Sequence, residues 1–356
     1  MNPESLAFLK RLLDTPGPSA FEAAPARVWR AEAERIADEV QVDVTGNSWA
    51  TLNPAGAARV MLAGHMDEIG VMVSHVDDDG FLSFEPIGGW DSQVFVGQRV
   101  ILMGRDGSVS GVVGKKAIHI MDKDEREKIS KIEDLWIDIG AVSRAEALTR
   151  VRIGDPGVLA SQVLEFPNGR IVSRSIDNRI GSFVVLEALR LLTQGERPAA
   201  SVTAVATTRE EISSSGGGAR PLTTHLDPMV AIVVDVTHAT DYPGIDKRRH
   251  GDYRLGGGPV LSRGASVNSA LFEMLAETAE REGIPYTIEA ASKDTRTDAE
   301  SIFNAHRGVA TALVSVPNRY MHSPNEMVAL EDLGRAARLL AAFTRRVTET
   351  TDFVPR

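Results

Sequence analysis

The amino-acid sequence predicts an α/β fold in which helices flank a mixed sheet and a small β domain is inserted between its two parts. Three observations lead to this prediction. Several short apolar, β-branched runs have the length of buried strands. After residue 171 such runs alternate with helical patterns. Between about residues 71 and 160 the chain instead forms short alternating runs separated by glycine-containing turns, which is typical of a small all-β unit.

Length and composition indicate a globular enzyme with one large and one smaller unit. The chain has 356 residues, of which 43% are hydrophobic and 25% are charged. Its 39 basic and 49 acidic residues give a net charge of −10, which argues against nucleic acid or an anionic membrane as a partner. The sequence has no cysteine, no apolar stretch as long as a membrane span and no signal-peptide pattern at its start, so we expect a cytoplasmic protein.

The first 70 residues predict the beginning of the α/β domain. Apolar residues spaced at helical intervals after Ser5 predict a short helix that ends at the turn over 15–18, and a second helix is expected over about 21–36. Strands are expected at Val40–Val44, at Trp49–Leu52 and at Val60–Ala63.

The all-β texture then interrupts this domain. Turn-forming residues recur at 78–80, 88–89, 105–107 and 155–157, with short alternating runs between them. We therefore expect residues 1–70 and 161–356 to form the two parts of the α/β domain, and residues 71–160 to form the inserted β domain.

The remainder of the chain returns to alternating strands and helices. Strands are expected at Val202–Ala206, Val230–Val234 and Val309–Val316. The clearest helical patterns cover Gly181–Leu192, Ser269–Glu282 and Leu333–Thr350.

Short polar clusters rich in His, Asp and Glu follow closely on four of the predicted strands, and a fifth cluster precedes a predicted helix. In open α/β sheets functional groups gather at the carboxyl ends of the strands, so these clusters are expected to meet in one crevice. The clusters are Gly64-His65-Met66-Asp67-Glu68, Ser175-Ile176-Asp177-Asn178-Arg179, Arg209-Glu210-Glu211, Asp235-Val236-Thr237-His238 and Met321-His322-Ser323-Pro324-Asn325-Glu326.

These residue types match the needs of a hydrolase with two divalent metal ions. Imidazole and carboxylate ligands without thiolates suit Zn, Co or Mn. Ionised Asp177, Glu210, Glu211 and Asp235 would balance the charge of two divalent cations. Each cluster taken alone is more commonly a helix cap or a surface charge, and Asp177 could simply cap the helix that follows it. Their joint occurrence after four strands favours the metal site. The absence of cysteine and of a Gly-x-Ser-x-Gly elbow argues against covalent catalysis.

At these residues the sequence resembles the M42 family of metallo-aminopeptidases, which includes glutamyl, deblocking and tetrahedral aminopeptidases. The resemblance extends from Thr-Pro-Gly-Pro-Ser-Ala-Phe-Glu at 15–22 to the last cluster. It is carried by Gly-His-Met-Asp-Glu-Ile-Gly at 64–70, Ile-Asp-Asn-Arg at 176–179, Glu-Glu at 210–211, Asp-Val-Thr-His-Ala at 235–239 and Tyr-Met-His-Ser-Pro at 320–324. It implies a zinc-exopeptidase-like α/β domain, an inserted β domain that mediates dimerisation, and a homo-oligomer, specifically a dodecamer.

The resemblance also implies roles for individual residues. Asp177 would bridge two ions, with His65 and Asp235 completing one ion and Glu211 and His322 the other. The remaining roles concern catalysis. Glu210 matches the general base, and Asp67 matches the acid that orients the imidazole of the first histidine. A cis peptide is expected after Asp67.

Two segments depart from the family pattern near the expected position of the substrate side chain. The loop Ser213–Gly218 is longer than the family's loop and lacks its arginine, and Lys293-Asp294-Thr295-Arg296 replaces a glycine-rich stretch ahead of Thr297 and Asp298. We expect Thr297 and Asp298 to contact the substrate. The mixed charges of this segment favour a neutral, leucine-like N-terminal residue, because selection of a charged one requires a fixed, desolvated partner.

The sequence thus predicts a di-metal aminopeptidase that acts on peptide substrates. Another di-metal amidohydrolase on the same scaffold, a carboxypeptidase or a deacylase, is the nearest alternative. A cellulase is a weaker alternative, because glycosidases use two carboxylates without metal whereas these acids are interleaved with histidines. A scaffold that had lost its metals would be expected to have lost ligand residues, and all five are present.

Overall fold

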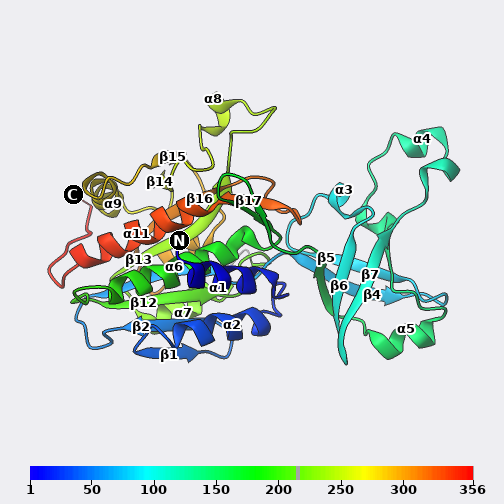
Figure 1. Cartoon of the computed structure of the whole chain (residues 1–356), viewed down its shortest axis with the longest axis horizontal. Helices are drawn as coiled ribbons and strands as arrows, with labels where there is room; N and C mark the ends of the chain where they lie inside the picture. Colours follow the sequence, from blue (N-terminus) through cyan, green and yellow to red (C-terminus); the bar gives the residue numbers. More distant parts are fainter. Residues whose placement is uncertain (214–216, 356) are drawn as a thin grey trace.

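A mixed sheet of eight strands forms the centre of the larger part of the molecule (Figure 1). The structure is a computed structural model that describes residues 1–213 and 217–355. It confirms the predicted α/β fold class. Strands β12, β3, β13 and β16 are neighbours and run parallel, while β1, β2 and β14 add antiparallel pairings. In their order across the sheet the strands are β1 (Glu39–Val42), β2 (Ser48–Leu52), β12 (Ser201–Thr207), β3 (Arg59–His65), β13 (Val230–His238), β16 (Ala310–Asn318), β14 (Val260–Gly264) and β15 (Thr287–Ala291).

Helices cover both faces of this sheet. One face packs against the larger core, to which α1 (Pro3–Asp14), α2 (Ala23–Ala33), α6 (Ile176–Thr193), α9 (Ser269–Arg281) and α11 (Leu330–Arg346) contribute. The other face packs against α7 (Ala219–Leu226) and α10 (Asp298–Phe303). Strand β3 illustrates the two-sided burial: Val60 and Leu62 enter the first core, and Met61 and Ala63 enter the second. This alternation explains why the run Val60–Ala63 is apolar throughout.

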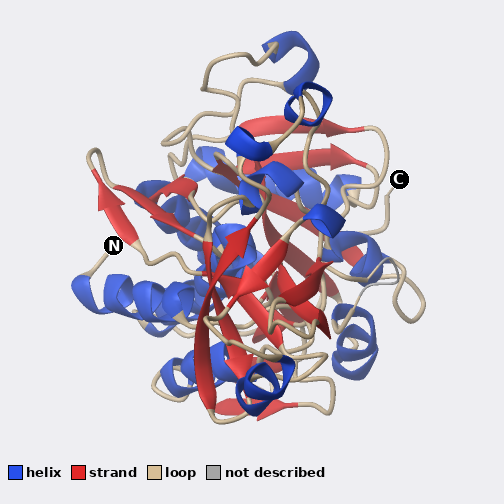
Figure 2. Cartoon of the chain, turned by 90° about the vertical axis from the view of Figure 1, so that its right-hand side faces the viewer, coloured by secondary structure: helices blue, strands red, loops and turns tan. Residues whose placement is uncertain are grey.

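Residues from Gly70 to Leu159 form a separate closed barrel, which lies beside the central sheet in Figure 1 and faces the viewer in Figure 2. Its interior is a core of its own that includes Val71, Phe84, Val100 and Ile137. Around the barrel the strands are β4 (Gly70–Val76), β5 (Leu82–Ile87), β8 (Trp136–Asp138), β7 (Gly107–Gly114), β6 (Arg99–Gly104) and β9 (Pro156–Leu159). Short helices accompany them: α3 (Ser92–Phe95), α4 (Lys123–Arg126), α5 (Arg144–Arg150) and two 3-10 turns at Ile118–Ile120 and Ile132–Asp134.

A small antiparallel sheet lies next to the point where the chain leaves the barrel. It consists of β10 (Leu164–Phe166), β11 (Arg170–Ser173) and β17 (Glu326–Ala329). A short helix, α8 (Lys247–His250), stands out at the top of Figure 1. Within the residues that the structure describes, no helix has the length and apolar character needed to cross a membrane.

Candidate metal centre

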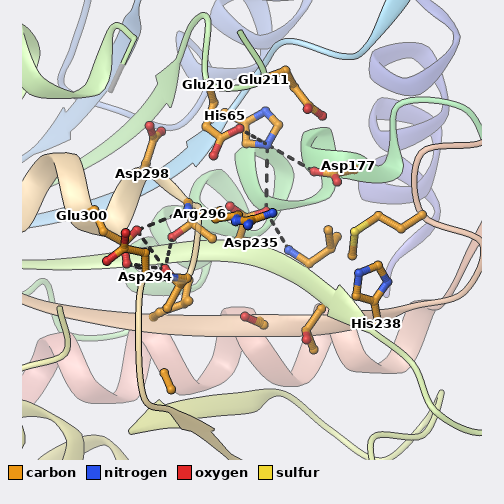
Figure 3. A pocket seen from close by; sticks show the side chains of 18 of the residues that line it. His65, Asp177, Glu210, Glu211, Asp235, His238, Asp294, Arg296, Asp298 and Glu300 are labelled. Atoms are coloured by element: carbon orange, nitrogen blue, oxygen red, sulfur yellow. Dashed lines mark hydrogen bonds and ion pairs between the residues drawn. The ribbon is translucent and has the colours of Figure 1, made fainter. Parts of the chain in front are cut away.

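The carboxyl ends of the four parallel strands meet at one edge of the sheet, and the predicted site residues gather there. His65 ends β3, Glu210 and Glu211 follow β12, and Asp235 lies near the end of β13. His322 follows β16, and Asp177 lies in the first turn of α6. Figure 3 shows His65, Asp177, Glu210 and Asp235 converging from these different elements.

The ligand atoms fall into two groups of three that share Asp177. His65, Asp177 and Asp235 have ligand atoms within 4.8 Å of one another, and so have Asp177, Glu211 and His322. The Oδ1 atom of Asp177 lies 3.2 Å from Nε2 of His65, and its Oδ2 atom lies 3.5 Å from Nε2 of His322. All five residues that the sequence nominates as ligands therefore lie together, with Asp177 between the two histidines.

Glycines allow Asp177 to come this close to β3. A Cβ atom on Gly64 would lie 2.4 Å from the backbone of Gly181, and one on Gly181 would lie 2.6 Å from the carbonyl oxygen of Val234. Helix α6 can thus rest directly on β3 and β13. Asn178 adds a hydrogen bond from its side-chain amide to the Val234 carbonyl at 2.8 Å. The start of α6 is therefore fixed over the strand ends.

The cis peptide lies in this same turn. The expectation that it would follow Asp67 is wrong: the cis bond joins Asp177 to Asn178.

Asp67 contacts both the first histidine and the glutamate pair. Nδ1 of His65 lies 3.4 Å from Oδ1 of Asp67, which leaves Nε2 directed at Asp177. The Asp67 carboxylate also accepts hydrogen bonds at 3.1 Å from the backbone amides of Glu210 and Glu211. The fully buried carboxylate of Asp67 thus fixes the relative positions of His65, Glu210 and Glu211.

Two further groups hold the second histidine, and neither was predicted from the sequence. Glu326 is buried and accepts hydrogen bonds from the amides of Asp177 (3.0 Å) and His322 (2.9 Å). The carbonyl oxygen of Gly89, which belongs to the barrel, lies 2.7 Å from Nδ1 of His322. A hydrogen bond from Nδ1 to this carbonyl leaves Nε2 as the nitrogen that faces Asp177 and Glu211. Glu326 stands within the last polar cluster, which was the available signal.

The site brings several carboxylates together in a largely buried environment. Burial, with smaller contributions from neighbouring carboxylates, raises the pKa values of Asp235 and Glu210 well above the ordinary carboxyl range. Burial also disfavours ionisation of Asp177, but hydrogen bonds from His322 and His65 outweigh it and lower its pKa. Burial likewise opposes protonation of His322, yet Asp177 and Glu211 raise its pKa to about 11. This cluster of buried carboxylates therefore favours the binding of positive charge.

A pair of divalent ions fits this donor set. Nitrogen and oxygen donors in two groups of three suit Zn, Co or Mn. The Oε1 atom of Glu211 is buried without a hydrogen-bond partner among the described residues, as is expected of an oxygen that awaits a ligand. Glu210 belongs to neither group, although its Oε2 lies 3.8 Å from Nε2 of His65.

A cavity of about 1230 Å³ opens above the two groups, and the segment 289–298 forms one of its walls. Thr297 and Asp298, the expected substrate contacts, both line it. The Thr297 hydroxyl caps α10 by accepting from the Ala299 amide at 3.1 Å. Asp298 accepts from the Thr207 hydroxyl at 2.5 Å, its Oδ1 has no partner among the described residues, and burial raises its pKa to about 6. Part of the departing loop Ser213–Gly218, at 214–216, lies outside the described residues.

The sequence and the fold are similar to those of known proteins. A family model described as M42 glutamyl aminopeptidase matches residues 46–339. A lysyl aminopeptidase from Pyrococcus furiosus is 34% identical to this chain, over 98% of this chain and 99% of its own length. A TET aminopeptidase structure from a marine sediment archaeon of the Thaumarchaeota is 35% identical, covers 97% of both chains and superposes with a TM-score of 0.92. The Pyrococcus horikoshii TET1 peptidase, which can assemble into a tetrahedron or a large octahedral shell, is 29% identical, covers 96% of this chain and 100% of its own, and has a TM-score of 0.84.

Proposed function

The chain belongs to the M42 glutamyl aminopeptidase family, and we propose that it releases N-terminal residues from peptides with the help of two divalent metal ions. Membership makes it a peptide-bond hydrolase of the aminopeptidase type. The observation that carries the two-metal proposal is the position of Asp177, which directs one carboxylate oxygen at each histidine. A carboxylate in this position can bridge two ions.

The residues would divide between the ions as the two groups of three divide. One ion would be held by His65, Asp177 and Asp235, and the other by Asp177, Glu211 and His322. When bound, such ions polarise the scissile carbonyl and lower the pKa of water towards about 7. Zn, Co and Mn all accept these donors.

Glu210 is the proposed general base. Because it lies outside both groups, its carboxylate stays free to take a proton from the attacking water and to return it to the leaving amine. Asp67 supports this role in two ways, since it orients His65 and accepts from the Glu210 amide. The side chain of Glu210 is 14% exposed and lines the cavity, so the base is largely removed from solvent but remains accessible to a substrate.

We propose a preference for neutral, leucine-like N-terminal residues. Lys293, Asp294 and Arg296 are exposed on the cavity wall, where solvent weakens their pull on a charged side chain. The Glu300 carboxylate already accepts hydrogen bonds from Thr295 and Thr297. A basic residue is the second candidate, because the free oxygen of Asp298 is buried and one relative is named a lysyl aminopeptidase.

The activity and the preference can be tested together on aminoacyl-anilides. We expect the leucyl anilide to be hydrolysed with the highest kcat/KM among leucyl, lysyl and glutamyl substrates, because an apolar side chain needs only a suitably shaped pocket. N-acetyl-leucyl anilide, the matched control, should resist hydrolysis, since it lacks the free amine.

Three results would change the proposal. Release of acetate from the acetylated control would indicate a deacylase, and release of C-terminal residues from blocked peptides would indicate a carboxypeptidase. A kcat/KM about ten-fold higher for the lysyl or glutamyl substrate than for the leucyl one would overturn the preference.

A second test concerns metal content. Asp177→Ala should remove both metals, because both ions share this carboxylate, whereas His65→Ala and His322→Ala should each mainly weaken one ion. Elemental analysis of the purified variants measures this directly. Loss of one metal to the same extent in all three variants would contradict the bridging assignment.

We further propose that the protein is a cytoplasmic homo-oligomer, a dodecamer that dimerises through the barrel. The assembly of the similar TET1 peptidase supports a large oligomer. The barrel segment between β7 and β8 also exposes three isoleucines, Ile118 (56%), Ile120 (69%) and Ile129 (65%), a pattern typical of a surface that another subunit covers.

A further inference from the structure

The turn that carries Glu210 and Glu211 is held by side chains of three other segments. Four successive backbone amides, from Thr208 to Glu211, each donate to a side-chain oxygen. The acceptors, in order, are Asn47 at 3.0 Å, Glu22 at 3.0 Å and the two oxygens of Asp67 at 3.1 Å each. The position of the glutamate pair thus depends on groups outside β12.

Glu22 is the acceptor in this set that bonds the residue directly before the proposed base. It lies 5% exposed at the start of α2, and its Oε1 atom accepts both the Arg209 amide and the amide of Ala20 at 2.8 Å. Arg209 has a positive φ of 61°, a conformation that costs a non-glycine residue free energy and persists only where its surroundings impose it. The bond from Glu22 is aimed at this residue, directly before the proposed base.

The segment that carries Glu22 is itself anchored beneath the site. Ser19 donates from its backbone amide to the Glu68 carbonyl at 3.1 Å and from its hydroxyl to Asp67 at 2.5 Å. Arg179, fully buried, donates to the Gly17 carbonyl at 3.1 Å and to the Met66 carbonyl at 3.0 Å. These contacts fix residues 17–22 relative to β3 and α6, so Glu22 offers a rigid acceptor to the turn.

We propose that Glu22 is a positioning residue that holds the Arg209 turn, so that the Glu210 carboxylate points at the attacking water. The inference rests on the proposed hydrolysis, with Glu210 as its base. The length of the Glu22 side chain places Oε1 at the Arg209 amide. A shorter side chain would let the turn shift, and a displacement of about 1 Å at a catalytic group can cost on the order of 10² in rate. The charge of Glu22 is not what the turn requires, since the donor is a neutral amide.

Two variants distinguish the effect of the side-chain length of Glu22 from that of its charge. Glu22→Asp keeps the charge but withdraws the carboxylate by one methylene, and we expect kcat on the leucyl anilide to fall about 10- to 100-fold with little change in KM or metal content. Glu22→Gln keeps the oxygen at the same reach and should retain a kcat close to that of the wild type. Amide hydrogen exchange over residues 208–213 should be faster in Glu22→Asp and unchanged in Glu22→Gln.

Glu32 provides the matched control. It is similarly buried at 4% on α2 and pairs with Arg190 at 2.6 Å, away from the turn. Glu32→Ala should lower Tm while kcat and exchange at 208–213 stay as in the wild type. Wild-type kcat in Glu22→Asp, equal losses in Glu22→Asp and Glu22→Gln, or faster exchange at 208–213 in Glu32→Ala would each overturn the inference. Failure of the wild type to cleave any anilide would instead refute the proposed function, and the exchange measurement would still decide whether Glu22 holds the turn.

Discussion

Replacing Glu210 by Gln should lower kcat by roughly 10²–10⁴ while both metals remain bound, the range typical of a missing general base. The amide keeps the shape of the side chain but cannot accept the proton of the attacking water. The metals should stay, because Glu210 belongs to neither group of three. KM should change little, since the substrate's binding contacts are retained. Steady-state kinetics on the leucyl anilide, with elemental analysis of the same preparation, measures both outcomes.

Glu211→Gln is the control that tests the assignment within the pair. Glu211 lies with Asp177 and His322, its Oε2 being 3.4 Å from Nε2 of His322, so its replacement should reduce metal content as well as rate. If metal is lost from Glu210→Gln and kept by Glu211→Gln, the roles of the two residues are exchanged. Undiminished kcat in Glu210→Gln would remove it from catalysis.

Chelation should abolish hydrolysis, and addition of Zn, Co or Mn should restore it, because water near neutral pH becomes a sufficient nucleophile only on the metals. The five nominated ligands support this dependence, since they form two groups of three that would hold the ions. Activity would be followed with the leucyl anilide before chelation, after chelation and after addition of each metal, with metal content determined at each stage.

A folding control accompanies the chelation experiment. The core of the α/β domain is formed by apolar contacts between the sheet and its helices, so the metal-free protein should keep its secondary structure. Circular dichroism before and after chelation separates loss of the site from loss of the fold. Full turnover by a preparation shown to be metal-free would exclude the two-metal mechanism.

The central strands could be predicted from sequence because both of their faces are buried. Val230–Val234 is apolar along its whole length and Val202–Ala206 is apolar except for Thr203, as expected of strands between two helical layers. Strands β14 and β15 were not predicted, because β14 ends in the exposed residues Arg263 and Gly264 and no residue of β15 is fully buried. The pairing of β4 with β9 in the barrel joins residues more than 80 positions apart, and local patterns carry no information about such pairing.

The predicted ligands come together because each follows a strand or begins a helix, and the order of parallel strands then brings their ends side by side. The groups that were not predicted from the sequence all make hydrogen bonds in which one partner is a backbone atom. Glu326 accepts amides, Gly89 offers a carbonyl and Glu22 receives an amide from a distant turn. The local sequence does not show whether an acid is buried or which amides it accepts, so the last polar cluster marks Glu326 without showing its contacts.

The bond between Gly89 and His322 bears on how this protein can be recombined with its relatives. The barrel has its own core and is joined to the α/β domain by two chain crossings, so it would be a natural unit to exchange in a chimaera. Yet one of its carbonyls lies 2.7 Å from Nδ1 of His322, and the preceding Gly88 has a φ of 78° and packs against Ile69 too closely for a side chain. A transplanted barrel must therefore bring this glycine turn in the same position. The inserted unit is modular in its core and constrained at the loop that reaches the site.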